Sequence, residues 1–166
     1  MDINETIVKT QIEDFEIIKL DVLNSITSMG QFSYYKSGDQ RIHNTDWHLS
    51  KDVKRPYWDV IKEQVELHNN EVKKFYNFNK YRYTNYWFQQ YVLDDFHGLH
   101  THPCCMFSNV VYIENASQTR FVFNNNEIEI PVSEGTIITF PSFLMHSYYH
   151  KQDNRRTIIS FNSNGE

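Results

Sequence analysis

The second half of the chain is a succession of short segments in which polar and apolar residues alternate. From Tyr83 onward these segments read "YTNYWFQQYV", "MFSNVVYIE", "TRFVF", "EIEIP", "GTIITF" and "RTIISFN", and they are rich in β-branched and aromatic residues. This composition and period are typical of β-strands. Since no helical pattern separates the segments, they predict an antiparallel sandwich or barrel.

Turn residues separate several of these strands. The three asparagines at 124–126 predict a hairpin, because asparagine tolerates a positive φ. Gly135, which ends the sequence "SEG", predicts another turn. We therefore expect short strands joined by tight turns.

The first half of the chain has a helical pattern instead. Pro56 suits the first position of a helix, and the apolar residues that follow recur with a 3.6-residue spacing on one face, which predicts a helix over 56–76. Asp21 and Gly30 predict the start and the end of a shorter helix, and "FEIIKL" just before it predicts a short strand. The helices are expected to pack against the outside of the β-structure.

Length and charge limit the class of protein. A chain of 166 residues suits a single domain, 1–166. Twenty-one acidic residues against sixteen basic ones, with no basic stripe, disfavour a nucleic-acid partner. No apolar run approaches the roughly 20 residues that cross a membrane. The N-terminal residues lack the pattern of a secretory signal. The two adjacent cysteines do not suit a secreted disulfide framework. A cytoplasmic protein is expected.

A cluster of potential metal ligands lies in "HGLHTHPCCMF", residues 97–107. Residues two apart in a strand point to the same side, so His100 and His102 are expected to present their imidazoles together. Two neutral imidazoles suit iron, zinc, copper or nickel, and a third ligand must come from elsewhere. His146, after a strand and the Pro141 turn, is the candidate. His97 lacks such a pairing and is interpreted, like the similarly unpaired His150, as an ordinary residue.

The adjacent cysteines leave two interpretations open. Cys104 or Cys105 can supply a thiolate to a mixed histidine and cysteine zinc site. Alternatively, both are small core residues at the start of a strand, because free cysteine is commonly buried.

The last strand carries an arginine that can face the interior. Arg156, Ile158 and Ser160 share one face of "RRTIISFN". An arginine directed into a barrel needs a carboxylate or phosphate partner, which a bidentate pair satisfies. Spacing alone equally allows Arg155 and Arg156 both to be solvated where the strand begins.

Several of these segments, taken in order, resemble a known family. Asn85, Trp87, "YVLDDFHGLHTHP", "SNVVYIE", "PVSEGTIITFPSFLMH" and "RRTIISFN" resemble the 2-oxoglutarate- and iron(II)-dependent oxygenases, in particular small phage and bacterial members. The resemblance covers about residues 83 to 162. It implies a mainly β fold with flanking helices, a double-stranded β-helix or cupin-like jelly-roll barrel over 81–164, with 1–80 as a mostly helical covering segment.

The resemblance also implies roles for individual residues. Three histidines become ligands of iron(II), and Arg156 holds the distal carboxylate of 2-oxoglutarate. Three further residues become hydrogen-bonding partners of that co-substrate. The metal ligands are His100, His102 and His146, and the co-substrate partners are Gln89, Tyr91 and Ser160.

One position departs from the family pattern. The superfamily has H-x-D or H-x-E where this chain has His102, so the iron keeps its +2 charge until a dianionic co-substrate binds. Asp94 and Asp95 are poorly spaced to supply the missing carboxylate.

The activity that the resemblance implies is a dioxygenase reaction. It couples decarboxylation of 2-oxoglutarate to hydroxylation of a small molecule or polypeptide by dioxygen, in the host cytoplasm if the chain is phage-encoded. Two alternatives stay open: a three-histidine cupin-type metal protein that does not use 2-oxoglutarate, and a non-catalytic jelly-roll binding module. The sequence assigns neither a substrate nor an oligomeric state.

Overall fold

The computed structural model describes residues 3–30 and 32–166. Over these residues a short 3-10 helix, η1 (Ile3–Thr6), precedes two α-helices, α1 (Phe15–Met29) and α2 (Pro56–Tyr76). The strands are β1 (Val8–Gln11), β2 (Ser33–Ser37), β3 (Gln40–Thr45), β4 (Tyr81–Tyr91), β5 (Phe96–His100), β6 (Phe107–Glu114), β7 (Arg120–Phe123), β8 (Asn126–Glu129), β9 (Thr136–Pro141), β10 (Met145–Tyr149) and β11 (Arg156–Gly165).

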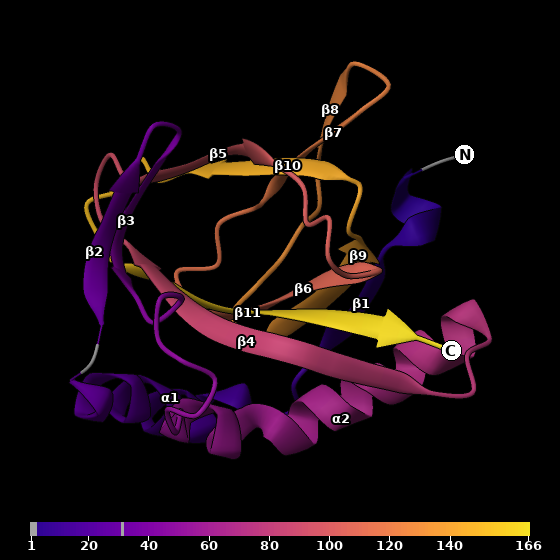
Figure 1. Ribbon diagram of the computed structural model, residues 1–166, viewed down its shortest axis with the longest axis horizontal. Coiled ribbons are helices and arrows are strands. Elements are labelled where there is room, and N and C mark those ends of the chain that lie inside the picture. Colours follow the sequence, from indigo (N-terminus) through magenta and orange to yellow (C-terminus); the bar gives the residue numbers. More distant parts are fainter. Residues whose placement is uncertain (1–2, 31) are drawn as a thin grey trace.

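The strands form one curled antiparallel sheet. Its order is β1-β9-β6-β11-β4-β3-β5-β10-β7-β8, with β2 paired to β3. β5 and β10 lie opposite the layer that contains β4, β11 and β6, and β3 joins the two layers because it pairs with both β4 and β5 (Figure 1). This arrangement confirms the predicted jelly-roll with flanking helices.

The two α-helices cover the outer face of the layer formed by β4, β11 and β6 (Figure 1). The helix predicted over 56–76 is confirmed as α2, and Pro56 occupies its first turn. Its apolar face packs on outward side chains of the sheet and forms the larger core. The buried members of this contact include Tyr57, Trp58, Ile61, Val65, Phe88, Val111, Ile159 and Phe161.

The opposite faces of the same strands line the interior of the barrel. Because side chains alternate along a strand, Phe88 faces the helices while Tyr91 belongs to an interior core. This core includes Tyr112, Phe121, Phe140, Tyr148 and Ile158. The register pairs Arg156 with Tyr91 across β11 and β4, so the C-terminal strand carries its predicted site residues into this interior.

The predicted turns are confirmed. Asn124 and Asn125 have φ values of 49° and 60° between β7 and β8. Gly135 has a φ of 80°, and a Cβ at this position would lie 2.7 Å from the Phe15 side chain, so glycine is required on both grounds.

The beginning of the chain differs from the prediction. "FEIIKL" is not a strand, because it forms the first turns of α1, which begins at Phe15 and buries Val22 and Ile26 on the same face. The helix ends at Gly30 as predicted, with φ 59°, but the start predicted at Asp21 is wrong, because Asp21 lies inside α1. The strands β1, β2, β3 and β10 were not predicted. Of these, β2 is largely exposed, which leaves little alternation between buried and exposed residues to detect. Within the described residues, neither helix is long and apolar enough to span a membrane.

Candidate metal centre

Three histidines converge inside the barrel. His100 ends β5 and His146 lies in β10, where the two residues are direct partners in the antiparallel pair. His102 follows β5 in an irregular segment, and its backbone N–H donates to the Ser142 carbonyl at 3.0 Å. The metal-ligating atoms of the three side chains all lie within 4.8 Å of one another. The predicted grouping is present, but β5 ends at His100, so strand alternation does not place His102.

Two of the rings are fixed by backbone carbonyls. The Nδ1 atom of His100 lies 2.8 Å from the carbonyl oxygen of Gly98, and that of His146 lies 2.9 Å from the carbonyl oxygen of Leu144. A carbonyl only accepts, so each Nδ1 carries the proton and donates it. The Nε2 atom of each ring therefore keeps its lone pair, which is the arrangement of a metal-binding histidine.

Burial keeps these imidazoles neutral. It lowers the pKa of His146 to about 3 and that of His102 to about 4, and it also lowers the pKa of His100. Mutual repulsion between the ring charges adds to the effect at His146 and His102. A metal ion binds neutral imidazole, so at neutral pH protons compete weakly for this donor set.

His97 belongs to the site, contrary to the prediction. Its ring stacks on that of His100 with centroids 3.8 Å apart. The register of β5 and β10 shifts between His146, which pairs with His100, and Tyr148, which pairs with His97. Three positions along β5 therefore match two along β10. This bulge returns His97 to the side of His100. The Gln89 amide donates to Nδ1 of His97 at 3.3 Å, and burial lowers the pKa of His97 to about 2.

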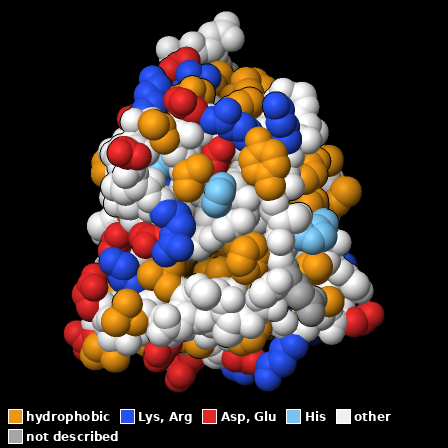
Figure 2. Space-filling model, turned by 90° about the vertical axis from the view of Figure 1, so that its left-hand side faces the viewer, with side chains coloured by type: hydrophobic (Ala, Val, Ile, Leu, Met, Phe, Trp, Pro, Cys, Tyr) orange, Lys and Arg blue, Asp and Glu red, His pale blue; other side chains and the backbone are white. Residues whose placement is uncertain are grey.

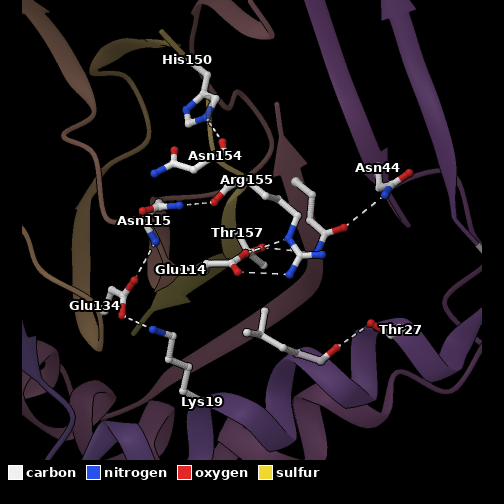
Figure 3. A network of polar contacts seen from close by, with 12 residues as sticks. Lys19, Thr27, Asn44, Glu114, Asn115, Glu134, His150, Asn154, Arg155 and Thr157 are labelled. Atoms are coloured by element: carbon white, nitrogen blue, oxygen red, sulfur yellow. Dashed lines mark hydrogen bonds and ion pairs between the residues drawn. The ribbon is translucent and has the colours of Figure 1, made fainter. Parts of the chain in front are cut away.

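The two arginines at the start of β11 have different environments. Arg155 lies outside the barrel and forms a bidentate pair with Glu114, at 2.8 and 3.1 Å (Figure 3). Arg156 is 1% exposed, and its Nη2 donates to the Ser117 carbonyl at 3.2 Å. Its Nε and Nη1 atoms have no hydrogen-bond partner among the described residues. The inward orientation is therefore the correct alternative for Arg156.

Tyrosine rings surround the Arg156 guanidinium. Its Cζ atom lies 3.6 Å from the ring centroid of Tyr148, 5.4 Å from that of Tyr91 and 5.5 Å from that of Tyr112. These contacts supply cation–π attraction but no hydrogen-bond acceptor, so within the described part of the chain two donors stay unpaired and favour an anion. The Tyr148 hydroxyl is hydrogen-bonded at 2.6 Å to the buried His150. His150 therefore orients a site residue, which the sequence did not indicate.

A small interior cavity of about 40 Å³ connects these groups. Gln89, Tyr91, Arg156 and Ser160 line it together with the three converging histidines, so the sequence-predicted residues are brought together. The Ser160 hydroxyl donates to the Gln89 side-chain oxygen at 3.2 Å. Among the described residues, none of those that line this cavity is Asp or Glu. Its electrostatic field therefore favours anions.

Other potential ligands lie elsewhere. The group of metal-ligating residues found among residues 3–30 and 32–166 contains the three histidines and neither cysteine, so the mixed zinc site is not supported. Cys104 is exposed and Cys105 half-buried, so the interpretation as core residues is also wrong. Asp95 pairs with Arg41 at 3.0 Å and supplies no carboxylate to the site.

The fold and the site define a double-stranded β-helix protein with a three-histidine cluster and an inward-facing arginine. Similar solved structures include a 2OG-Fe(II) oxygenase family oxidoreductase from Burkholderia pseudomallei, with a TM-score of 0.73, 14% identity, and coverage of 95% of this chain and 85% of that chain. A Pseudomonas putida prolyl-4-hydroxylase has a TM-score of 0.70, 10% identity, and coverage of 95% and 91%.

A third similar structure is a Trichoplax adhaerens prolyl hydroxylase in complex with a hypoxia inducible factor peptide fragment. Its TM-score is 0.70 at 12% identity, with 96% of this chain and 83% of that chain covered. The sequence matches no protein-family model and no curated protein. These likenesses establish the shared fold.

Proposed function

We propose that the protein is a 2-oxoglutarate- and iron(II)-dependent oxygenase that hydroxylates its substrate. The observation that carries the proposal is the presence, around one cavity, of a neutral three-imidazole donor set and a buried guanidinium with two unpaired donors. A metal and a dicarboxylate satisfy both groups at once. The fold shared with solved 2OG-Fe(II) oxygenases supports the same assignment.

The donor set fits iron(II). His100, His102 and His146 would hold the ion, with Nε2 as the free donor atom of His100 and His146. When bound, iron with 2-oxoglutarate and dioxygen supplies the oxidising chemistry, in which decarboxylation to succinate and carbon dioxide accompanies hydroxylation of a C–H bond.

The remaining residues would bind and orient the co-substrate. Arg156 would pair its Nε and Nη1 donors with the distal carboxylate, and this pairing would satisfy the groups that lack partners. Ser160 and Gln89 offer neutral hydrogen-bonding atoms beside it, and the Tyr91 ring helps to enclose it. The aromatic walls exclude water, which strengthens the ion pair.

The absence of a carboxylate ligand also supports a dianionic co-substrate. Three neutral imidazoles leave the iron charge at +2, and Arg156 adds a further positive charge on the same cavity. No acidic side chain among the described lining residues offsets these charges. A dicarboxylate that reaches both centres therefore gains more here than it would beside an H-x-D site.

The test is anaerobic titration of the protein with iron(II), with and without 2-oxoglutarate. The proposal expects a metal-to-ligand charge-transfer absorption band that requires both, and succinate formation when air is admitted. Binding of iron without the band would instead identify a three-histidine cupin-type metal protein, which the replacement of a carboxylate by His102 also suits. Absence of iron binding by the folded protein would leave only a jelly-roll binding module.

A further inference from the structure

A second, larger cavity adjoins the metal centre. It has a volume of about 310 Å³ and shares His97, His100 and His102 with the interior cavity. Residues of β2 and β3 also line it, including Tyr35 and Ile42. Figure 2 faces this side of the molecule and shows hydrophobic side chains in a hollow near the centre of the face. A group bound in this cavity would lie beside the metal ligands.

The lining of the larger cavity is uncharged. None of its described lining residues is Asp, Glu, Lys or Arg, although such residues make up 22% of the chain. The described side chains offer a charged guest no charged partner here, and the dianionic co-substrate would offset the +2 charge of a metal held by the histidines. A charged guest would therefore lose its hydration without compensation, which is costly. The cavity therefore selects an uncharged group, in contrast to the anion-favouring interior.

Two tryptophans form adjoining aromatic walls of the cavity. Trp47 and Trp87 have ring centroids 4.4 Å apart and an interplanar angle of 71°. A flat ring stacked on one of these indoles presents its edge to the other, and both are preferred aromatic geometries. Trp87 is 5% exposed whereas Trp47 is 51% exposed, so Trp47 offers an open face at the entrance.

The segment that carries Trp47 is anchored to the core. The preceding residue, Asp46, is fully buried and accepts hydrogen bonds from Arg55 at 2.6 Å, from the Tyr57 hydroxyl at 2.7 Å and from the Phe88 N–H at 2.8 Å. These contacts fix the backbone next to Trp47 without covering its ring. An exposed aromatic residue on a fixed segment binds a ligand at low entropic cost.

One polar atom of the lining accepts no hydrogen bond from the described residues. Asn162 is 8% exposed and lines both cavities, and its Oδ1 atom has no hydrogen-bond partner among the described residues. A buried amide oxygen without a partner costs free energy. A guest with an O–H or N–H group would satisfy it.

From these observations we propose that the larger cavity is the substrate site, and that it takes an uncharged aromatic ring bearing a hydrogen-bond donor. Trp47 and Trp87 stack the ring, and Asn162 accepts its hydrogen bond. The assignment of this ring as the group to be hydroxylated rests on the proposed oxygenase function, whereas its binding to the cavity does not.

The test measures binding of 4-methylphenol and 4-methylbenzoate by ligand-observed NMR and calorimetry. Both probes carry the same ring, but only the first is uncharged with a donor. Titrations use the protein alone and the protein with zinc(II) and 2-oxoglutarate, which supports no turnover. We expect 4-methylphenol to bind at least about tenfold more tightly than 4-methylbenzoate. Equal affinities, or no binding of 4-methylphenol, would overturn the proposal.

Variants locate the bound probe. Trp47→Ala is expected to weaken 4-methylphenol binding about tenfold, Trp47→Phe to restore most of it, and Asn162→Leu to weaken it several-fold. The control is Tyr34→Ala, which removes an aromatic side chain of similar exposure from β2 that does not line the cavity. Unchanged affinity in folded Trp47→Ala would overturn the proposed site.

The experiments distinguish a failure of the proposed oxygenase function from a failure of the proposed aromatic site. Selective phenol binding that depends on Trp47, without a charge-transfer band for iron and 2-oxoglutarate, would retain the aromatic site and remove the oxygenase function. The band with no selective phenol binding would retain the function and overturn the substrate class.

Discussion

His97 and His100 stack almost in parallel, with an interplanar angle of 9°, although they are three positions apart in β5. In a regular strand this separation would place the two rings on opposite faces. The bulge between β5 and β10 changes the alternation between His97 and His100. Gly98 lies in this stretch, and its N–H donates to the Asp39 carbonyl at 2.7 Å. A Cβ on Gly98 would lie 2.5 Å from that oxygen.

Gly98→Ala is therefore expected to disturb the bulge and to loosen the metal centre. The Asp39 backbone must move to relieve the clash, which we expect to cost about 1–3 kcal/mol of unfolding free energy. Metal affinity should fall about tenfold, because the Gly98 carbonyl also orients His100. Thermal unfolding and cobalt(II) titration measure the two effects. Gly38→Ala is the control, since a Cβ there meets nothing within 4 Å, and equal behaviour of both variants would contradict the role of the bulge.

Arg156→Met is expected to weaken binding of 2-oxoglutarate without destabilising the fold. Loss of a charge-assisted hydrogen bond, worth roughly 1.5–3 kcal/mol, weakens 2-oxoglutarate binding by about one to two orders of magnitude. The unfolding free energy should not fall, because the substitution removes a buried charge that has no acidic partner among the described lining residues. Calorimetric titration with 2-oxoglutarate checks the first effect, with metal affinity expected to stay constant. Wild-type affinity for 2-oxoglutarate would remove Arg156 from the co-substrate site.

Tyr148 is expected to act by positioning the Arg156 guanidinium. Tyr148→Leu removes the ring 3.6 Å from Arg156 and should raise the KM for 2-oxoglutarate about tenfold, with a smaller change in kcat. Tyr148→Phe keeps the ring but loses the hydrogen bond to His150, so its KM should lie near that of the wild type. Steady-state succinate formation gives both constants. If the Phe and Leu variants raised KM equally, the hydroxyl and not the ring would hold Arg156.

Local patterns in the sequence predicted the elements whose period is regular. The helix over 56–76 has one continuous apolar face, and its bounds are those of α2. Asn124, Asn125 and Gly135 adopt the positive φ values that their residue types favour. The prediction that His146 joins His100, by contrast, rested on residue types and chain order. The pairing of two strands whose partner residues are 46 positions apart leaves no local signal in the sequence.

The missed features depend on tertiary contacts. "FEIIKL" has the residues of a strand, but packing of Val22 and Ile26 against α2 and the sheet favours one continuous helix. A bulge moved His97 into the site, and a hydrogen bond to Ser142 placed His102 beyond the end of β5. The inward orientation of Arg156 required the register of β11, which alternation alone does not supply.

His102→Asp tests the charge of the metal centre. An anionic ligand in place of a neutral imidazole attracts a divalent ion more strongly, so the variant should retain cobalt(II) binding with equal or higher affinity. Its affinity for 2-oxoglutarate should fall, because the added negative charge repels the dianion. Leu99→Asp is the matched control, since it adds the same charge at an exposed neighbouring position that lines neither cavity and lies outside the ligand group. Complete loss of metal binding by folded His102→Asp would contradict a ligand role for this position.

The stability of the fold should depend on pH through His68. This buried residue of α2 hydrogen-bonds Thr10 and Thr139, each at 2.7 Å, and burial lowers its pKa from 6.5 to about 4. The unfolded chain therefore binds the proton more readily between these values. The contribution of neutral His68 is complete above pH 6.5, decreases as the pH falls to about 4, and amounts to about 3 kcal/mol at most.

Denaturant unfolding at pH 7 and pH 4.5 measures this dependence. The site histidines add their own dependence, so the relevant quantity is the difference between wild type and His68→Gln, which should lose less stability on acidification. His43→Gln, at an exposed position of β3, should keep the wild-type difference between the two pH values. A His68→Gln protein that loses as much stability as the wild type between pH 7 and pH 4.5 would show that His68 is protonated in the folded state, and would exclude it as a source of acid sensitivity.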